Sequence, residues 1–276
     1  MAAVSITLLN QKGGVGKTST CHHLAGTLAA AGRRILLVDN DPQSSLTQGL
    51  LGPQATRDLD PAGTIAAAYS GVAVLEQVIR RTEIAGIDLV PGSRHAMKFN
   101  MPEPWTADRD WQLGIRDIVE AVRDRYDLVL IDCPPNLHLC SWAALVASDF
   151  VVVPLQPEDY GSQGIVDVQE SVALVAELAN PGLSILGYLI TMAQPRRSIH
   201  QMYEETLRAQ YRDDVFSTRV PHAAEFPEAI AYRKPIAQYK PRGAAAKAIK
   251  ALADELLARV ESRRHCAGLP GEVEAA

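Results

Sequence analysis

The sequence is poor in cysteine and in long apolar runs, and both shortages exclude classes of protein. Four cysteines are scattered over 276 residues without the close spacing of metal ligands, so we expect idle thiols in a reducing compartment. No apolar run approaches the ~18 residues of a membrane-spanning helix, and the start lacks the apolar core of a secretory leader. We therefore expect an intracellular, cytoplasmic protein. The cysteines are Cys21, Cys133, Cys140 and Cys266.

A formal net charge of −5 hides an uneven distribution along the chain. Residues 194–250 contain 11 lysines and arginines against 6 acidic residues, so this part is basic and the remainder strongly acidic. A basic C-terminal third on an acidic body is a candidate surface for a polyanion.

Residues 11–18, Gln-Lys-Gly-Gly-Val-Gly-Lys-Thr, directly follow the apolar run Val4–Leu9 and have the composition of a phosphate-binding loop. The glycines can take positive φ angles and carry no side chain, so backbone N–H groups can converge on phosphate oxygens. Lys17 would contact the β- and γ-phosphates, and the Thr18 hydroxyl would bind Mg²⁺. A purely structural glycine-rich turn is the alternative. The predicted nucleotide-binding residues here are Gln11, Lys12, Gly13, Gly14, Val15, Gly16, Lys17, Thr18 and Ser19.

Two lysines distinguish this loop from the common pattern, which has glycine at the position of Gln11 and requires no lysine at position 12. Together with residues 36–43 (LLVDNDPQ), 127–135 (DLVLIDCPP) and 152–157 (VVPLQP), the loop resembles the ParA/Soj/MinD family of partition and positioning ATPases, and within it the ParA/Soj branch. A weaker similarity covers residues 235–255, so the resemblance extends from about residue 4 to about residue 260. It implies a P-loop ATPase of the deviant Walker A type, with ATP and Mg²⁺ as cofactors.

Apolar runs alternate with helical periodicity, which predicts an α/β fold with a doubly wound, mostly parallel sheet flanked by helices. We expect strands at Val4–Leu9, Arg34–Asp39, Ile87–Val90, Leu128–Asp132, Phe150–Leu155 and Ser184–Met192. We expect helices at Lys17–Ala31, Ile65–Tyr69, Trp111–Arg125, His138–Ala147, Gly164–Ala179, Ile199–Tyr211 and Ala244–Arg263. The stretch Gly52–Gly63 is predicted to be an exposed loop, residues 1–263 a single P-loop ATPase domain, and residues 264–276 a disordered tail.

Three aspartates follow predicted strands, at the edge where a parallel sheet gathers its functional groups. Asp132 ends an apolar strand like a Walker B carboxylate that holds Mg²⁺ through its water shell, although it could instead cap the next turn. The resemblance implies that Asp41 orients the attacking water and that Asp39 supports the Mg²⁺ hydration shell. Asp41 could alternatively form a turn before proline. The predicted metal residues are Thr18, Asp39 and Asp132, and the predicted catalytic residues are Lys12, Lys17 and Asp41.

Lys12 is the residue on which the expected quaternary structure depends. In the family that the chain resembles, the lysine at this position reaches across a dimer interface to the phosphates of the partner, like an arginine finger. The resemblance therefore implies a homodimer that ATP joins and hydrolysis releases. A solvated surface charge is the alternative.

The family also suggests where the adenine base would lie. The matching positions are Met192, in the segment Thr191–Met192, and Pro221, after Val220. Both residues could equally be a core residue and a turn residue. The polar residue expected two positions after Met192 is Gln194.

In the ParA/Soj branch the ATP-bound dimer binds non-specific DNA through C-terminal lysines and arginines, because phosphate contacts need charge rather than base-reading geometry. Close relatives of Soj often have an arginine a few residues after the Val-Pro turn, where this chain has Glu225, so DNA binding is expected to be shifted or weaker. Ordinary surface charge is the alternative for each residue alone. The predicted DNA-binding residues are Arg196, Arg197, Arg219, Arg233, Lys240, Arg242, Lys247 and Lys250.

The resemblance implies a slow, nucleoid-associated ATPase that partitions a chromosome or plasmid, or positions another cargo, and is stimulated by a centromere-binding, ParB-like partner or a cargo adaptor. A MinD-like membrane association is the main alternative, since residues 249–260 carry an apolar stripe, but the stripe is alanine-rich and has no Trp or Phe, which favours a core-facing helix. A metabolic P-loop ligase would need a second substrate pocket. An iron-protein-like electron donor would need cluster cysteines in that family's motifs, which Cys133 and Cys140 do not occupy.

Overall fold

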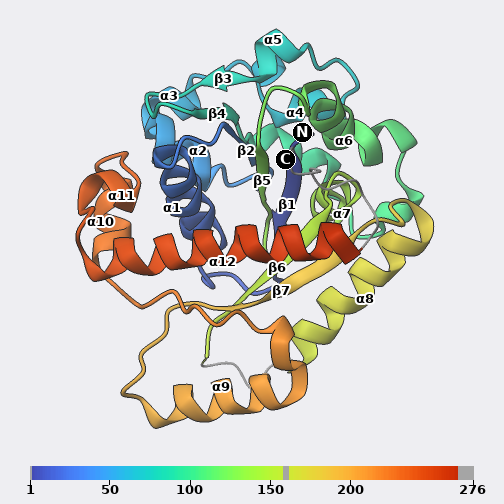
Figure 1. Ribbon diagram of the computed structural model, residues 1–276. Coiled ribbons are helices and arrows are strands. Elements are labelled where there is room, and N and C mark those ends of the chain that lie inside the picture. Colours follow the sequence, from blue (N-terminus) through green and yellow to red (C-terminus); the bar gives the residue numbers. More distant parts are fainter. Residues whose placement is uncertain (1, 158–161, 267–276) are drawn as a thin grey trace, which may run out of the picture.

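A seven-stranded sheet forms the centre of the computed structural model, which describes residues 2–157 and 162–266 (Figure 1). Within this described part the strand order is β3-β4-β2-β5-β1-β6-β7, and all neighbours are parallel except the antiparallel pair β3 and β4. The strands are β1 (Val4–Leu8), β2 (Ile35–Asp39), β3 (Arg80–Arg81), β4 (Ile87–Val90), β5 (Leu128–Asp132), β6 (Phe150–Leu155) and β7 (Ser184–Ile190).

The central strands are apolar on both faces because helices cover the sheet on both sides. Every residue of β1, β2, β5 and β6 is buried. The six strands expected from the sequence are all present, with ends that differ by two residues at most. The strand β3 was not expected, because its two exposed arginines carry no apolar signal.

The helices confirm the alternating pattern and add short segments that the sequence did not indicate. The stretch Gly52–Gly63, expected to be an exposed loop, instead contains a short α-helix and a 3-10 turn, each with proline at its first position, where the missing N–H costs nothing. The C-terminal helix extends to Cys266, three residues past its predicted end at Arg263, and residues 267–276 lie outside the described part. The helices are α1 (Lys17–Ala30), α2 (Ser45–Leu51), α3 (Pro53–Arg57), α4 (Ile65–Tyr69), α5 (Leu75–Val78), α6 (Arg109–Val122), α7 (Leu139–Val146), α8 (Ser162–Leu178), α9 (Ser198–Tyr211), α10 (Glu225–Ala231), α11 (Ile236–Tyr239) and α12 (Ala244–Cys266), with 3-10 turns η1 (Pro61–Gly63), η2 (Arg94–Phe99), η3 (Pro104–Thr106) and η4 (Arg212–Asp214).

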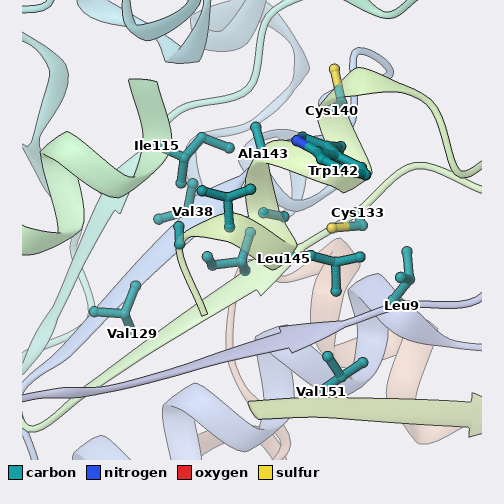
Figure 2. Close-up of a cluster of buried hydrophobic side chains, with 14 of the residues drawn as sticks. Leu9, Val38, Ile115, Val129, Cys133, Cys140, Trp142, Ala143, Leu145 and Val151 are labelled. Carbon is teal, nitrogen blue, oxygen red and sulfur yellow. The ribbon is translucent and has the colours of Figure 1, made fainter. Parts of the chain in front are cut away.

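Two apolar cores, one on each face of the sheet, confirm the doubly wound architecture. Helices α4, α6, α7 and α8 pack on one face, where Trp142, Leu145 and Ile115 meet side chains of the strands (Figure 2). Helices α1, α2, α10, α11 and α12 cover the other face. Cys133 and Cys140 are free thiols buried in the first core, consistent with the expected idle role.

The apolar stripe of α12 faces the protein interior. Ile249, Leu252, Leu256 and Val260 are all buried and belong to the core that includes α1. The stripe is therefore not available to a membrane, which counts against the MinD-like alternative. No helix in the described part of the chain is both long enough and apolar enough to cross a bilayer.

Helix α12 also fixes the connection that leads from α9 to the turn at Pro221. Arg259 donates hydrogen bonds to the carbonyls of Asp213 (2.9 Å) and Val215 (2.8 Å). Glu255 accepts hydrogen bonds from the backbone N–H groups of Ser217 and Thr218, both at 2.8 Å. Burial raises the pKa of Glu255, but these hydrogen bonds outweigh it and the net pKa is lower than usual.

Helix α1 carries two adjacent histidines that are buried against α10 and α11. The Nδ1 atom of His23 accepts a hydrogen bond from the backbone N–H of Ile236 (3.0 Å). Both ring nitrogens of His22 and Nε2 of His23 have no hydrogen bond of good geometry within the described residues. A Cβ on Gly26, one turn further along α1, would overlap Pro235, so the two segments approach closely. Because both rings are buried without an acidic partner among these contacts, the histidine pair is neutral in the folded protein.

This burial predicts that the two histidines destabilise the fold on mild acidification. Burial lowers the pKa of His22 to about 4 and that of His23 to about 3, whereas a histidine in the unfolded chain titrates near 6.5. As the pH falls below 6.5, the unfolded chain binds protons that the folded chain cannot, so the free energy of unfolding falls, by about 2 kcal/mol per histidine at pH 5. The raised pKa values of the buried Asp39 and Asp132 act in the opposite direction over the same pH range, so the histidine effect is measured as a difference between two proteins. Urea denaturation at pH 7.5 and pH 5 should show that the double variant His22→Asn, His23→Asn gains stability relative to the unmodified protein on acidification. An identical pH response in both proteins would contradict the prediction.

Candidate nucleotide and magnesium site

The predicted phosphate-binding loop joins the end of β1 to the start of α1, at the carboxyl edge of the sheet (Figure 1). Gly14 (φ 81°) and Gly16 (φ 82°) have left-handed backbones that other residues rarely adopt, and Gly16 is the N-cap of α1. The first turn of α1 has no acidic residue, so the positive end of its helix dipole faces the loop without compensation. The residues predicted to bind nucleotide in the loop thus lie together in an anion-binding arrangement.

Lys17 is held over the interior of the loop. Its side chain is buried, and its Nζ donates hydrogen bonds to the carbonyls of Asn10 and Lys12, both at 3.0 Å. Burial lowers the pKa of Lys17, while Asp132 acts in the opposite direction. The two carbonyls fix the position of the ammonium group before any phosphate is present.

Asn10 shapes the loop, a role that no sequence pattern indicated. Its Nδ2 donates to the carbonyl of Pro154 at the end of β6 (2.7 Å), and its Oδ1 accepts from the backbone N–H of Lys12 (2.9 Å). Both partners are backbone groups, one 144 positions away and one two positions away, and a pattern of residue types does not reveal such contacts. Asn10 therefore ties the loop to the neighbouring strand and holds the backbone of Lys12 at its exposed rim.

Asp132 is an acidic residue of the protein interior, at the end of β5 and directly beside the loop. It is completely buried, and neither of its oxygens makes a hydrogen bond of good geometry in the chain as described. The register of β2 and β5 pairs it with Asp39, so that two acidic residues stand side by side at the strand ends. Burial, followed by the charge of Asp39, raises the pKa of Asp132 far above its ordinary value, while Thr18 and Lys17 lower it.

These acidic residues fit a magnesium ion. Two buried carboxyl groups of like charge are unfavourable as an ionised pair, and a divalent cation held by oxygen atoms would compensate both. Thr18, whose hydroxyl at the start of α1 interacts with the carboxyl group of Asp132, adds a third oxygen ligand. The three residues predicted to bind metal are thus neighbours around one position.

Asp39 is fixed by a network that the sequence did not indicate. Its Oδ2 accepts hydrogen bonds from the backbone N–H (2.7 Å) and the hydroxyl (2.6 Å) of Thr47, and its Oδ1 accepts one from the N–H of Asp41 (3.3 Å). A Cβ on Gly92 would lie 2.7 Å from the same carboxyl group, so only glycine fits there. Burial raises the pKa of Asp39 to about 7, although the bonds from Thr47 oppose the shift. Asp39 is therefore held in one orientation beside Asp132.

Asp41 forms an Asx turn before Pro42, the alternative role for this residue in the sequence analysis. Its Oδ1 accepts a hydrogen bond from the backbone N–H of Gln43 (2.9 Å), and the residue is half-buried at the rim of the site. The turn fixes Asp41 just beyond the end of β2, near Asp132 and Lys17, with which it interacts electrostatically. The turn does not conflict with a role in orienting water, and that role stays a prediction.

The segment after Asp132 is connected both to the loop and to the strand β2. A Cβ on Gly13 would lie 4.0 Å from the Cβ of Pro135, so the loop and this segment touch. Asn40, between Asp39 and Asp41, donates to the carbonyl of Cys140 and accepts a hydrogen bond from the hydroxyl of Tyr69 (2.6 Å). The start of α7 is thereby linked to the strand that carries Asp39.

The two residues expected near adenine lie close to the loop. The hydroxyl of Thr191 donates to the carbonyl of Val15 (2.8 Å), and a Cβ on Gly16 would lie 3.9 Å from the Cε of Met192. A β-bridge between Ala193 and Pro221 brings the second residue alongside. The position suits a base attached to a nucleotide in the loop, and the contacts themselves stay a prediction.

The eight residues predicted to bind DNA fall into two separate groups. Arg196 and Arg197 directly precede α9, and Arg219 contacts Glu204 of that helix. The other five lie on or next to α10, α11 and α12, helices that Figure 1 shows away from α9. Arg219 is paired with Glu204 (2.8 Å) and Lys240 with Glu228 (3.2 Å), which reduces the charge they offer. The sequence could not show these pairings, because each acid lies on an earlier helix.

Comparisons with known proteins agree with this site. A family profile described as an AAA domain (AAA_31) matches residues 3–185. The chromosome partitioning protein ParA of Caulobacter vibrioides is 34% identical over 262 residues, which cover 94% of this chain and 96% of that protein. The chromosome-partitioning ATPase Soj of Thermus thermophilus is 38% identical, with 93% and 96% covered.

A similar solved structure carries the ligands that the site fits. Cobyrinic acid a,c-diamide synthase from Mycobacterium smegmatis, with bound ATP analog and magnesium, superposes with a TM-score of 0.79 at 25% identity, and the match covers 95% of this chain and 97% of that chain. ATP and Mg²⁺ are thus the cofactors that the loop and the paired aspartates accommodate. The profile, the two relatives and the residues of the loop agree: the chain belongs to the ParA/Soj family of chromosome-partitioning ATPases.

Proposed function

We propose that the protein is an ATP-dependent switch that dimerises with ATP, binds DNA without sequence preference in that state, and partitions or positions a chromosome or plasmid. One observation carries the proposal above others: a loop with two lysines lies beside a buried pair of carboxyl groups, of which Asp132 makes no hydrogen bond of good geometry within the described residues. A nucleoside triphosphate bound together with Mg²⁺ would compensate both kinds of charge, because its phosphates would face the lysines and the metal would face the carboxyl groups.

The residues of the site would have three roles in ATP hydrolysis: phosphate binding, metal binding and orientation of the attacking water. Lys17 and the backbone N–H groups of the loop would bind the phosphates, and Asp41 would orient the attacking water. Thr18, Asp39 and Asp132 would hold Mg²⁺, which, when bound, neutralises phosphate charge. The fixed positions of Lys17 and Asp39 support this assignment, because they need no rearrangement before reaction.

Lys12 would act on the nucleotide of a second subunit. Its backbone is fixed at the exposed rim of the loop by Asn10 and Lys17, so its side chain starts from the part of the loop that a partner can approach. ATP would then lie between two subunits, and its hydrolysis would separate them. A dimer doubles the number of phosphate contacts with DNA, so the nucleotide state controls DNA affinity.

The relatives support the cargo, since both are named for chromosome partitioning. We infer that a small centromere-binding partner of the ParB type stimulates a slow hydrolysis, and that the protein acts in the cytoplasm on the nucleoid. Positioning of a cargo other than DNA, by the same switch, is the second candidate.

The test is DNA binding as a function of nucleotide. Fluorescence anisotropy of a labelled duplex should show tight binding with ATP and Mg²⁺, and at least about tenfold weaker binding with ADP. Raising the salt from 50 to 200 mM should weaken the ATP-dependent binding by about 10³-fold if six or more phosphates are contacted. Equal binding with both nucleotides, or none with either, would contradict the proposal.

A further inference from the structure

Residues 232–250 combine a dense positive charge with an exposed aromatic pair. The rings of Tyr232 and Tyr239 are stacked, with centroids 5.4 Å apart and planes inclined by 20°, and Tyr232 is 66% exposed. The segment runs from the C-cap of α10 through α11 to the first turns of α12, and these parts lie together at one end of the molecule (Figure 1, left). It contains no acidic residue and six cations: Arg233, Lys234, Lys240, Arg242, Lys247 and Lys250.

The turn after α10 keeps Tyr232 at the surface. The N–H of Arg233 donates to the carbonyl of Ile230 (2.8 Å) and that of Lys234 to the carbonyl of Ala229 (3.0 Å), the two bonds of a Schellman helix end. Arg233 takes the left-handed position of this motif, with φ 54°, where glycine is usual. Its guanidinium group lies against α2, where a Cβ on Gly52 would be 2.6 Å from Nη1. Arg233 thus points toward α2 while the preceding tyrosine stays outside.

Tyr239 gives the exposed ring a fixed support. Its hydroxyl donates to Glu228 (3.3 Å), and the ammonium group of Lys240 donates to the same carboxylate (3.2 Å) while lying 5.3 Å from the Tyr239 ring centroid. Tyr232 packs one face on this anchored ring. The rest of its surface is available to a planar ligand that the surrounding cations attract.

We propose that Tyr232 is a stacking platform for an unpaired base of a single-stranded nucleic acid, with the phosphates bound by Lys234, Arg242 and Lys247. The other cations of residues 232–250 contribute less, because Lys240 and Lys250 are paired with acidic residues and Arg233 lies against α2. The inference rests on the proposed DNA binding and goes beyond it, because duplex phosphates need only charge, whereas an exposed ring can stack only on a base that has left the helix. Aromatic stacking with positive charge along the backbone is how proteins bind single strands without sequence preference. The platform therefore gives the protein an affinity for unpaired strands that the charge alone does not explain.

The experiment compares three probes on the full chain with ATP and Mg²⁺: labelled dT20, rU20 and a 20-base-pair duplex, by fluorescence anisotropy. Tyr232→Ala should weaken binding of dT20 about tenfold and leave duplex binding within about twofold. Tyr232→Phe, which keeps the ring, should bind all probes within about twofold of the unmodified protein. Lys247→Ala should weaken single strands and duplex alike and reduce the salt dependence of both, because it removes a phosphate contact only.

The outcomes separate this inference from the proposed function. Duplex binding with no binding of dT20 or rU20, or a Tyr232→Ala effect equal on single strands and duplex, would overturn the stacking role and leave the proposed function standing. Binding of no probe would overturn both. A Tyr232 effect on dT20 and rU20 together identifies any unpaired strand as the ligand, and an effect on dT20 alone restricts it to DNA. Thermal unfolding of Tyr232→Ala should match that of the unmodified protein, because the ring is largely exposed.

Discussion

Lys17→Met is expected to abolish detectable ATP binding and to lower hydrolysis by at least about 10²-fold, the effect of removing one pre-positioned donor from a site where charge develops. The ammonium group of Lys17 already lies inside the phosphate-binding loop, held by the carbonyls of Asn10 and Lys12. No other cation in the described chain is buried beside Asp132, so no neighbour can replace it. Titration with a fluorescent ATP analogue and a phosphate-release assay measure the two losses.

Methionine is the informative substitute because it separates charge from packing. It keeps most of the volume of the lysine stem in a position that is only 7% exposed, and it removes the cost of burying an ammonium group in the nucleotide-free protein. Thermal unfolding without nucleotide should therefore be unchanged or shifted upward. ATP should raise the unfolding temperature of the unmodified protein and not that of Lys17→Met. Hydrolysis near the unmodified rate would show that Lys17 does not contact the phosphates.

The sequence predicted the loop and the strands around it because both depend on local signals. The spacing of Gly13, Gly14 and Gly16 requires a particular backbone, and the structure has positive φ at two of the three. Two buried apolar strands that end in aspartate predict that their carboxyl ends meet, and the register pairs Asp39 with Asp132.

The supports of these residues could not be predicted, because they come from elsewhere in the chain. Thr47 reaches Asp39 from the helix that follows it, and Tyr69 reaches Asn40 across 29 positions. Neither residue belongs to a spacing pattern: Thr47 makes two hydrogen bonds to Asp39, and Tyr69 makes one to Asn40. Sequence patterns therefore indicate which groups react, while the tertiary structure decides what orients them.

The basic surface shows the same limit in electrostatic terms. Counting lysines and arginines gave a candidate surface, but it could not show that Arg219 faces Glu204. Such a partly exposed pair contributes little to stability, yet it lowers the charge that a polyanion meets. The short helices α10 and α11, absent from the expected elements, are the ones that place Lys240 beside Glu228. Charge counts along a sequence thus overestimate the charge that a surface presents.

Lys12→Ala is expected to prevent ATP-dependent dimerisation and to lower hydrolysis by about 10³-fold, the lower range for a cation supplied to a partner's phosphates. The substitution leaves the loop intact, because Lys12 contributes its backbone N–H to Asn10 and its carbonyl to Lys17, and alanine provides both. ATP should therefore still bind to the monomer. Analytical ultracentrifugation with ATP and Mg²⁺ measures the oligomeric state, and the fluorescent analogue measures binding.

Asp41→Ala is the matched control, because it removes the residue expected to orient water and spares the contacts between subunits. Its loss should slow hydrolysis while ATP continues to join the subunits, so this variant should accumulate as a dimer where Lys12→Ala stays monomeric. The Asx turn to Gln43 would also be lost, but it lies on the surface and the fold should tolerate it. Unchanged oligomeric state in both variants would mean that ATP does not lie between two subunits. The lysine at position 12 would then be a surface charge, and the nucleotide could not control DNA binding through dimerisation.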